Sequence, residues 1–415
     1  MPMHFLLVCV GTDGDVMPFL GLAQLLSARR HDVTVVSHYR YAQRALSAGA
    51  EFWPLSGEVQ DDQSLRDMAI LNTRYTSLYV YRHVVEWNVE VLRAARRLCG
   101  VRSVLVSGER GLLWADFMAQ RHLGIPVIRG LVDPPLIVRP PAGSGQVPIS
   151  GVQRELGWKL DRRWRGSMKS LGIPVGVEQM PRLARLAQRE VPKFGLWPAW
   201  LLGESASSLP IPAMGFVSFQ GGDASKPPTF CLPEDGKRRV IFVAGSAGTR
   251  NWWTTEFART SAEACRKLGC SGLVLGATSS TDVECLAEGV FSTAYFPLDD
   301  ALRQAVAIVH HGGIGTAAAA MRQGVPQLIV PRMFSQPSNA EWLRRLGVAV
   351  VLDPREYVLE RVVETMAGIL GGATLRPRAL QVMGRSFQET EGERLCNFLE
   401  TWSVRAREKR ALSGT

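Results

Sequence analysis

One stretch of this chain constrains its fold more than any other. The apolar run Ala305–Val309 has the composition of a buried strand, and the turn His310–Thr316 that follows it contains three glycines. An alanine-rich helix is expected from Thr316. A strand that leads through a glycine-rich turn into a helix presents backbone N–H groups and the positive end of the helix dipole to an anion. Glycine allows close approach, and His311 adds a donor, so we expect a diphosphate site.

Length and composition narrow the class of protein. At 415 residues the chain suits two domains of about 200 residues each. It has no run of about 18 apolar residues, which argues against a membrane span. The apolar start at Met1–Val10 lacks a basic region and a cleavage site, so we interpret it as a first buried strand. Seven cysteines without Cys-x-x-Cys spacing indicate a reducing compartment, and we expect a cytoplasmic protein.

The formal net charge of +10 is concentrated in one stretch of the chain. Residues 151–200 hold ten Lys/Arg against four Asp/Glu, together with four tryptophans. One interpretation is peripheral contact with the inner face of a membrane or with an amphiphilic substrate. The other is a basic, solvated helix face without a partner. We expect no nucleic-acid partner.

Strands and helices alternate along both halves of the chain, which predicts two parallel sheets covered by helices. A stretch rich in Gly, Pro and Ser separates the halves. We therefore expect an N-terminal domain (1–219), a linker (220–237), a C-terminal domain (238–390), and a closing helix with a frayed basic tail (391–415). We interpret the region 61–200 as irregular in structure and rich in aromatic residues. Ligands of such sheets bind beyond the carboxyl ends of the strands, where three turns lie: Gly11–Pro18, Gly245–Thr249 and His310–Thr316.

Several short motifs occur along the chain in an order that indicates a known protein family. They are Gly14-Asp15-Val16-Met17-Pro18-Phe19, Gly245-Ser246, Tyr295-Phe296-Pro297-Leu298, His311-Gly312-Gly313-Ile314-Gly315-Thr316, Gly324-Val325-Pro326, and Gln336 with Asn339-Ala340. Together they resemble the family 1 nucleotide-sugar glycosyltransferases. Within that family the chain is most similar to bacterial rhamnosyltransferases of glycolipid synthesis and to sterol- and antibiotic-glycosylating enzymes. The resemblance implies the GT-B architecture, in which two Rossmann-like domains face each other across a cleft.

The resemblance also implies roles for individual residues of the donor site. The diphosphate would be bound by Gly245, Ser246, His311, Gly313, Gly315 and Thr316. The nucleotide base would stack on Tyr295 and meet the backbone of Phe296. The donor sugar would contact Ser335 and Gln336. His310 is interpreted as structural.

Asp15 is the candidate catalytic base. Inverting transfer needs a group that takes the proton from the acceptor hydroxyl during the attack. Plant members of the family have a histidine at this position, oriented by a distant aspartate. Here Asp15 stands instead, and only Glu109 and Arg110 lie near the partner position. The alternative is that Asp15 caps a helix that starts at Val16.

Two departures from the family pattern bear on the donor. The family usually has an Asp-Gln pair at the sugar, whereas this chain has Ser335-Gln336. Plant members hold the ribose with a glutamate where this chain has Ala319. Neither the donor sugar nor the way the ribose is held follows from the resemblance.

Two other motifs in the sequence suggest different chemistry. Gly313–Ala318 fits a dinucleotide-binding pattern, but the next strand ends in Pro331-Arg332 rather than in an acid for the ribose. Asp13-Gly14-Asp15 spells a metal-binding Asp-x-Asp, but it follows the first strand. We expect no metal and no cofactor beyond the nucleotide-diphosphate sugar as co-substrate.

The expected function is inverting transfer of a hexose or deoxyhexose from a UDP- or dTDP-sugar to a hydroxyl of a lipophilic acceptor, either rhamnolipid-like or a secondary metabolite. The acceptor would bind in the N-terminal domain, where aromatic residues are frequent. The alternative is a non-catalytic ligand-binding protein on the same scaffold.

Overall fold

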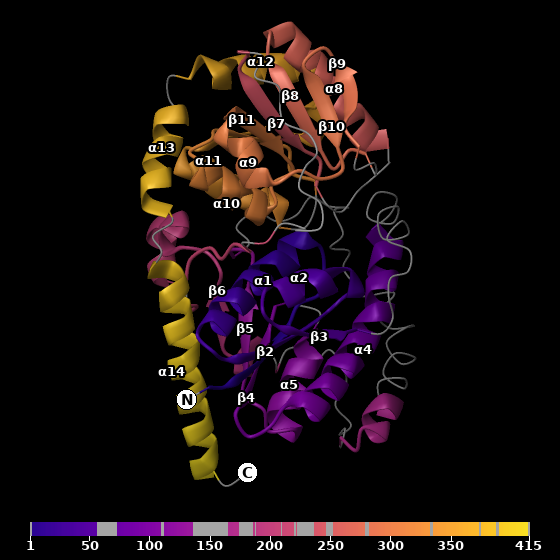
Figure 1. Cartoon of the computed structure of the whole chain (residues 1–415), viewed down its shortest axis with the longest axis vertical. Helices are drawn as coiled ribbons and strands as arrows, with labels where there is room; N and C mark the ends of the chain where they lie inside the picture. The colour runs from indigo at the N-terminus through magenta and orange to yellow at the C-terminus, as the bar shows by residue number, and fades with distance from the viewer. Residues whose placement is uncertain are drawn as a thin grey trace.

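The computed structural model describes residues 2–55, 73–108, 112–135, 165–173, 186, 188–208, 210–219, 221, 236–245, 252–278, 282–332, 335–372, 375–386 and 390–413. Within these ranges it describes the backbone alone for 73–85 and for several helix ends. The chain forms two α/β halves, and the long C-terminal helix α14 (Thr390–Ser413) runs alongside the N-terminal half (Figure 1). The expected fold class, two Rossmann-like units of GT-B type, is confirmed.

The N-terminal half is built on a six-stranded parallel sheet with the order β3-β2-β1-β4-β5-β6. This is the order of a dinucleotide-binding Rossmann sheet. Its strands are β1 (His4–Val8), β2 (Asp32–Ser37), β3 (Glu51–Pro54), β4 (Ser103–Ser107), β5 (Val127–Leu131) and β6 (Lys193–Gly195). The helices are α1 (Asp13–Ala28), α2 (Ala42–Ser47), α4 (Thr73–Leu98) and α5 (Leu113–His122), with the 3-10 turn η1 (Tyr39–Tyr41).

Strand β1 shows why this sheet is apolar on both faces. Leu6 and Val8 join a core cluster with residues of α4 and α5. Phe5 and Leu7 join a second cluster with residues of α1 and α14. Successive side chains of a strand point to opposite faces, so a strand covered by helices on both sides must be apolar throughout.

The C-terminal half has a seven-stranded sheet with the order β13-β12-β11-β7-β8-β10-β9, in which β9 alone of the described strands pairs antiparallel. Its strands are β7 (Arg239–Val243), β8 (Ser271–Leu275), β9 (Glu284–Ala287), β10 (Val290–Thr293), β11 (Ala305–His310), β12 (Gln327–Ile329) and β13 (Ala349–Val351). The helices are α8 (Trp252–Leu268), α9 (Leu298–Arg303), α10 (Ile314–Arg322), α11 (Gln336–Leu346), α12 (Leu359–Gly371) and α13 (Leu375–Ser386), with the 3-10 turn η4 (Pro354–Glu356).

A shared apolar cluster joins the two halves. Trp197 lies just before the 3-10 segment η3 (Ala199–Ser208), and Leu201 lies within it. Both pack with Trp342 of α11 and Ile314 of α10. Helices α10 and α11 lie on the side of the C-terminal half that faces the N-terminal half (Figure 1). The junction is therefore packed as a core on this side.

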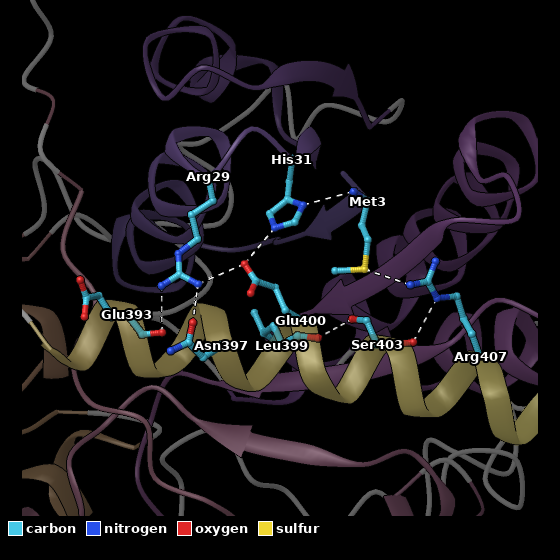
Figure 2. A network of polar contacts seen from close by, with 9 residues as sticks. All are labelled: Met3, Arg29, His31, Glu393, Asn397, Leu399, Glu400, Ser403 and Arg407. Atoms are coloured by element: carbon cyan, nitrogen blue, oxygen red, sulfur yellow. Dashed lines mark hydrogen bonds and ion pairs between the residues drawn. The ribbon is translucent and has the colours of Figure 1, made fainter. Parts of the chain in front are cut away.

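Helix α14 returns to the N-terminal half and is fixed there by polar as well as apolar contacts (Figure 2). Arg29 donates to Asn397 at 2.6 Å and to Glu400 at 3.1 Å, and His31 lies 3.0 Å from Glu400. The helix continues to Ser413, so our prediction of a frayed tail from Arg405 is wrong for this segment.

Other expectations need correction. The region 61–200 is not irregular throughout, because α4 fills 73–98. In contrast, Trp87, Trp114 and Phe117 are buried in a core cluster of the N-terminal half, as expected for most aromatic residues of this region. Trp197 is fully buried and Trp200 is half-buried at the domain junction, so neither offers a surface for a membrane.

Most of the linker 220–237, and 151–164 and 174–185 of the basic stretch, lie outside the described residues. Within the ranges that are described, no helix is both long and apolar enough to span a bilayer.

Candidate functional site

The β11–α10 turn lies where the strand order of the C-terminal sheet reverses. Strand β11 pairs with β7 in a register that puts His310 opposite Val243, so the turns that follow the two strands are neighbours. Gly245 has φ +99°, and a Cβ on it would come within 3.0 Å of the His311 ring. A reversal of this kind creates the crevice in which ligands of α/β sheets bind. Gly245 and His311, both expected at the diphosphate, are thus brought together; Ser246 lies outside the described residues.

Glycines shape the turn itself. Gly312 has φ +91°, a backbone conformation that side chains disfavour. A Cβ on Gly313 would lie 2.7 Å from His311 Nε2. Gly313 is the N-cap of α10, while Gly315 is exposed and Thr316 is half-buried in the first turn of that helix. The first N–H groups of α10 therefore lie beside an imidazole, an arrangement suited to an anion.

The two neighbouring histidines of the turn have different environments. His310 is buried, its Nδ1 accepts from the N–H of Gly312 at 3.2 Å, and its Nε2 lies 3.0 Å from Gln327 Oε1. These bonds fix the Nε2–H tautomer and support a structural role. Burial lowers the pKa of His310 to about 3, so the ring is neutral.

His311 is half-buried, and its Nδ1 has no hydrogen-bond partner within the described part of the chain. Burial lowers the pKa of His311 to about 4; the Val243 backbone opposes this shift and the charge of Arg332 adds to it. His311 therefore enters the site as a neutral donor at neutral pH. Burial likewise lowers the pKa of Arg332 to about 10, which leaves that residue charged.

Tyr295 and Phe296 follow β10 at the same edge of the sheet. Tyr295 is 46% exposed, whereas Phe296 is 9% exposed and packs in the core beneath α9 and α10. An aromatic side chain exposed at the carboxyl edge of a sheet suits stacking on a base. Its role, like that of the Phe296 backbone, stays a prediction.

Ser335 and Gln336 open helix α11. Ser335 is the N-cap and Gln336 the first helical residue, whose Oε1 accepts from the backbone N–H of Arg332 at 2.8 Å. A Cβ on Gly312 would lie 3.2 Å from the Gln336 carbonyl oxygen, so α11 begins against the diphosphate turn. Ala319 is buried in α10 and faces the core, so ribose would have to be held elsewhere.

The β1–α1 turn of the N-terminal half carries Asp15. Helix α1 begins at Asp13, with Thr12 as its N-cap, and not at Val16 as the alternative interpretation of Asp15 assumed. Asp15 Oδ2 accepts from the backbone N–H of Thr12 at 2.8 Å and from the Thr12 hydroxyl at 3.1 Å. Asp15 thus takes part in capping from the third helical position. Both bonds are donated to the same carboxylate oxygen.

Asp13, the lesser candidate for the base, takes part in a neighbouring polar cluster. Tyr41 donates to Asp13 Oδ1 at 3.0 Å, and Arg44 lies 3.7 Å from the same oxygen. Arg40 donates to the Gly11 carbonyl at 2.9 Å and braces the turn from the other side. Glu109 and Arg110 lie outside the described residues.

The two turns are connected across the domain junction. Helix α1 contacts α10. Asn339 Nδ2 donates both to the Gly312 carbonyl at 3.1 Å and to Oδ1 of Asp133, which follows β5 in the N-terminal half, at 3.0 Å. Sequence reasoning did not find Asp133, because nothing local distinguishes it; Asn339 was part of a motif but had no role assigned.

Comparison with known proteins agrees with this architecture. Residues 5–91 match the glycosyltransferase family 28 N-terminal domain, and residues 272–392 match the C-terminal domain of erythromycin biosynthesis protein CIII-like proteins. A sterol 3-beta-glucosyltransferase of Emericella nidulans is 25% identical over 85% of this chain and 26% of its own length. One from Arabidopsis thaliana is 24% identical over 84% of this chain and 57% of its own length. The chain thus spans only part of these sterol relatives.

The demethyllactenocin mycarosyltransferase of Streptomyces fradiae is 24% identical over 86% of this chain and 77% of its own length. Among solved structures, the calicheamicin glycosyltransferase CalG4 superposes with a TM-score of 0.70 at 19% identity, covering 97% of this chain and 99% of its own. The spinosyn rhamnosyltransferase SpnG, complexed with thymidine diphosphate, gives 0.60 at 20% identity, covering 92% and 95%.

The two-sheet fold and its paired turns define a GT-B protein. The matches to an N-terminal and a C-terminal glycosyltransferase domain, together with the similarity to these relatives, place the chain among the family 1 glycosyltransferases.

Proposed function

We propose that this protein is an inverting glycosyltransferase that moves a hexose or deoxyhexose from a UDP- or dTDP-sugar to a hydroxyl of a lipophilic acceptor. The observation that carries the proposal is the pairing of two turns. A glycine turn with a neutral histidine opens α10 in one half, and a turn with a carboxylate opens α1 in the other, with the two helices in contact.

The donor half would act on the leaving group. As the bond between sugar and diphosphate breaks, negative charge develops on the diphosphate, and the N–H groups at the start of α10 would stabilise it. His311 would add a hydrogen bond. Charge would therefore be stabilised by fixed dipoles of the protein, and the proposal includes no metal.

The acceptor half would activate the nucleophile. Asp15 would take the proton from the acceptor hydroxyl as that oxygen attacks the anomeric carbon from the side opposite the diphosphate. The bonds from Thr12 hold the carboxylate in place at the helix N-terminus. One displacement of this kind inverts the anomeric centre.

The relatives support the choice of substrates. Those named as sterol glucosyltransferases act on a lipophilic hydroxyl acceptor, and the mycarosyltransferase transfers a deoxyhexose. The spinosyn rhamnosyltransferase binds thymidine diphosphate. A rhamnolipid-like acceptor or a secondary metabolite fits this range.

Thermal unfolding with and without UDP, dTDP and their sugars tests the donor half of the proposal. A ligand at about 100 times its Kd stabilises the folded state by about 2.7 kcal/mol, which raises Tm by several degrees in domains of this size. No shift with any of these compounds would contradict the proposal. Binding without transfer to any lipophilic acceptor would favour the non-catalytic alternative instead.

A further inference from the structure

By the family resemblance, Ser335 stands where related glycosyltransferases have an aspartate at the donor sugar. A hydroxyl is a weaker hydrogen-bond acceptor than a carboxylate, and bonds to charged groups are about twice as strong as neutral ones. The start of α11 therefore lacks the charged acceptor that would hold sugar hydroxyls. The structure places a carboxylate from the other half of the protein close by.

That carboxylate belongs to Asp133. Its Oδ1 accepts from Asn339 Nδ2 at 3.0 Å, and Asn339 lies four residues, about one helical turn, beyond Ser335 in α11. The same Asn339 nitrogen reaches the carbonyl of Gly312 in the diphosphate turn at 3.1 Å. Asp133 is therefore joined through Asn339 both to the diphosphate turn and to α11, the helix that begins at Gln336.

The backbone around Asp133 is held in place. Asp133 precedes Pro134, and a residue before proline is restricted to extended conformations. The carbonyl of Pro135 accepts from Trp342 Nε1 at 3.1 Å, which attaches the loop to α11. Asp133 itself is half-buried, and within the described part of the chain its Oδ2 has no hydrogen-bond partner.

We propose that Asp133 supplies, from the N-terminal half, the carboxylate that binds hydroxyls of the donor sugar and so helps to set donor specificity. This inference rests on the proposed function. Asn339 orients the carboxylate through Oδ1, and Oδ2 accepts from a sugar hydroxyl. The nearby anionic diphosphate repels a carboxylate, so Asp133 contributes binding to the sugar and not to the nucleotide diphosphate.

Asp133→Asn is the primary test, because the amide keeps its size and can still accept from Asn339. We expect kcat/KM for the nucleotide sugar to fall roughly 10- to 100-fold, the range for loss of a hydrogen bond to a charged group. Titration calorimetry should give a Kd for free UDP or dTDP that is unchanged or slightly lower. Asn397→Ala is the matched control, since it removes an amide side chain that joins α14 to Arg29 far from the site.

The second test introduces a carboxylate at position 335 in place of the one removed from position 133. Ser335→Asp places an acid at the N-cap of α11, where aspartate is well tolerated. In the Asp133→Asn background this change should restore part of the lost kcat/KM.

Two results would overturn the inference. One is wild-type transfer by Asp133→Asn. The other is a parallel loss of transfer and of free nucleotide binding, which would make Asp133 a structural link between the halves. If the wild-type chain binds no nucleotide diphosphate at all, the proposed function fails, and that outcome is separate from both.

Discussion

At the scale of single residues, the two adjacent histidines differ in their hydrogen bonding and therefore in what each can do. His310 uses both ring nitrogens to hold the turn, whereas His311 has a buried Nδ1 without a partner and a pKa lowered by burial to about 4. The sequence pattern pointed to His311 as a donor that could also be a cation. The structure indicates a neutral donor before a ligand arrives.

A bound diphosphate should raise the pKa of His311, because an adjacent anion favours the protonated ring. Binding then takes up a proton between pH 4 and the pKa of the complex. Affinity for UDP or dTDP should therefore rise as pH falls through that window. Calorimetry in two buffers of different ionisation enthalpy measures this proton uptake.

His311→Gln is the control for that measurement, because the phosphate itself titrates near pH about 6. We expect the variant to bind more weakly and to take up fewer protons than the wild type. Equal proton uptake by both proteins would show that His311 does not face the diphosphate.

At the scale of elements, the start of α1 combines helix capping with placement of the candidate base. Asp15 reaches back to Thr12, and the space it occupies lies directly over Gly11. Gly11 has φ +135°, and a Cβ there would lie 2.3 Å from Asp15 Oδ2. The turn therefore requires glycine for both backbone and space.

Gly11→Ala should displace Asp15 and strain the turn. We expect a loss of about 1–3 kcal/mol in the free energy of unfolding together with reduced transfer. Chemical denaturation and initial-rate kinetics measure the two effects. In contrast, Gly368→Ala lies inside α12 with open space around it, and should be neutral or stabilising. Equal behaviour of the two variants would contradict this account of the turn.

At the scale of the whole molecule, α14 and the junction cluster hold the two halves together. The N-terminal end of α14 meets the segment that ends the N-terminal half: Arg394 donates to the Ala213 carbonyl at 2.9 Å, and Glu391 packs over Gly215. Burial raises the pKa of Glu391 from 4.5 to about 7, against the charge of Arg394 and the Phe216 backbone. Oε2 of Glu391 has no hydrogen-bond partner among the described residues.

This acid should make stability depend on pH. Between pH 4.5 and about 7 the folded state holds a proton at Glu391 that the unfolded state releases, so stability falls as pH rises through that window. Glu391→Gln should raise Tm at pH 8 relative to the wild type and change it little at pH 5. The neighbouring exposed Glu393→Gln serves as control, and a pH profile unchanged by Glu391→Gln would rule out this role.

The sequence predicted the architecture better than the site. The long apolar strand β11 and the start of α10 were predicted to within about two residues, because composition and glycine position indicate them. The short strands β3, β6 and β13 were missed, whereas the equally short β12 was predicted from the apolar run that ends at Pro331. The predicted start of helix α1 came too late in the sequence. We had interpreted Pro18 as an early helical position, whereas it lies inside the helix.

The position of Asp133 could not be predicted from the sequence at all. It lies 206 residues from Asn339, and only the folded arrangement of the two halves brings them together. The capping bonds of Asp15 were expected in part, but the N-cap proved to be Thr12. A sequence motif indicates the local backbone conformation of a turn or helix end. Contacts between the two halves depend instead on tertiary packing, which no local pattern predicts.

The most direct test of the central proposal is transfer by Asp15→Asn, measured beside nucleotide binding. The amide keeps the shape of the capping side chain but cannot act as a base. We expect the rate of transfer to fall about 10²- to 10⁴-fold with unchanged Kd for UDP or dTDP, while Asp13→Asn loses far less. Wild-type transfer by Asp15→Asn would contradict the account.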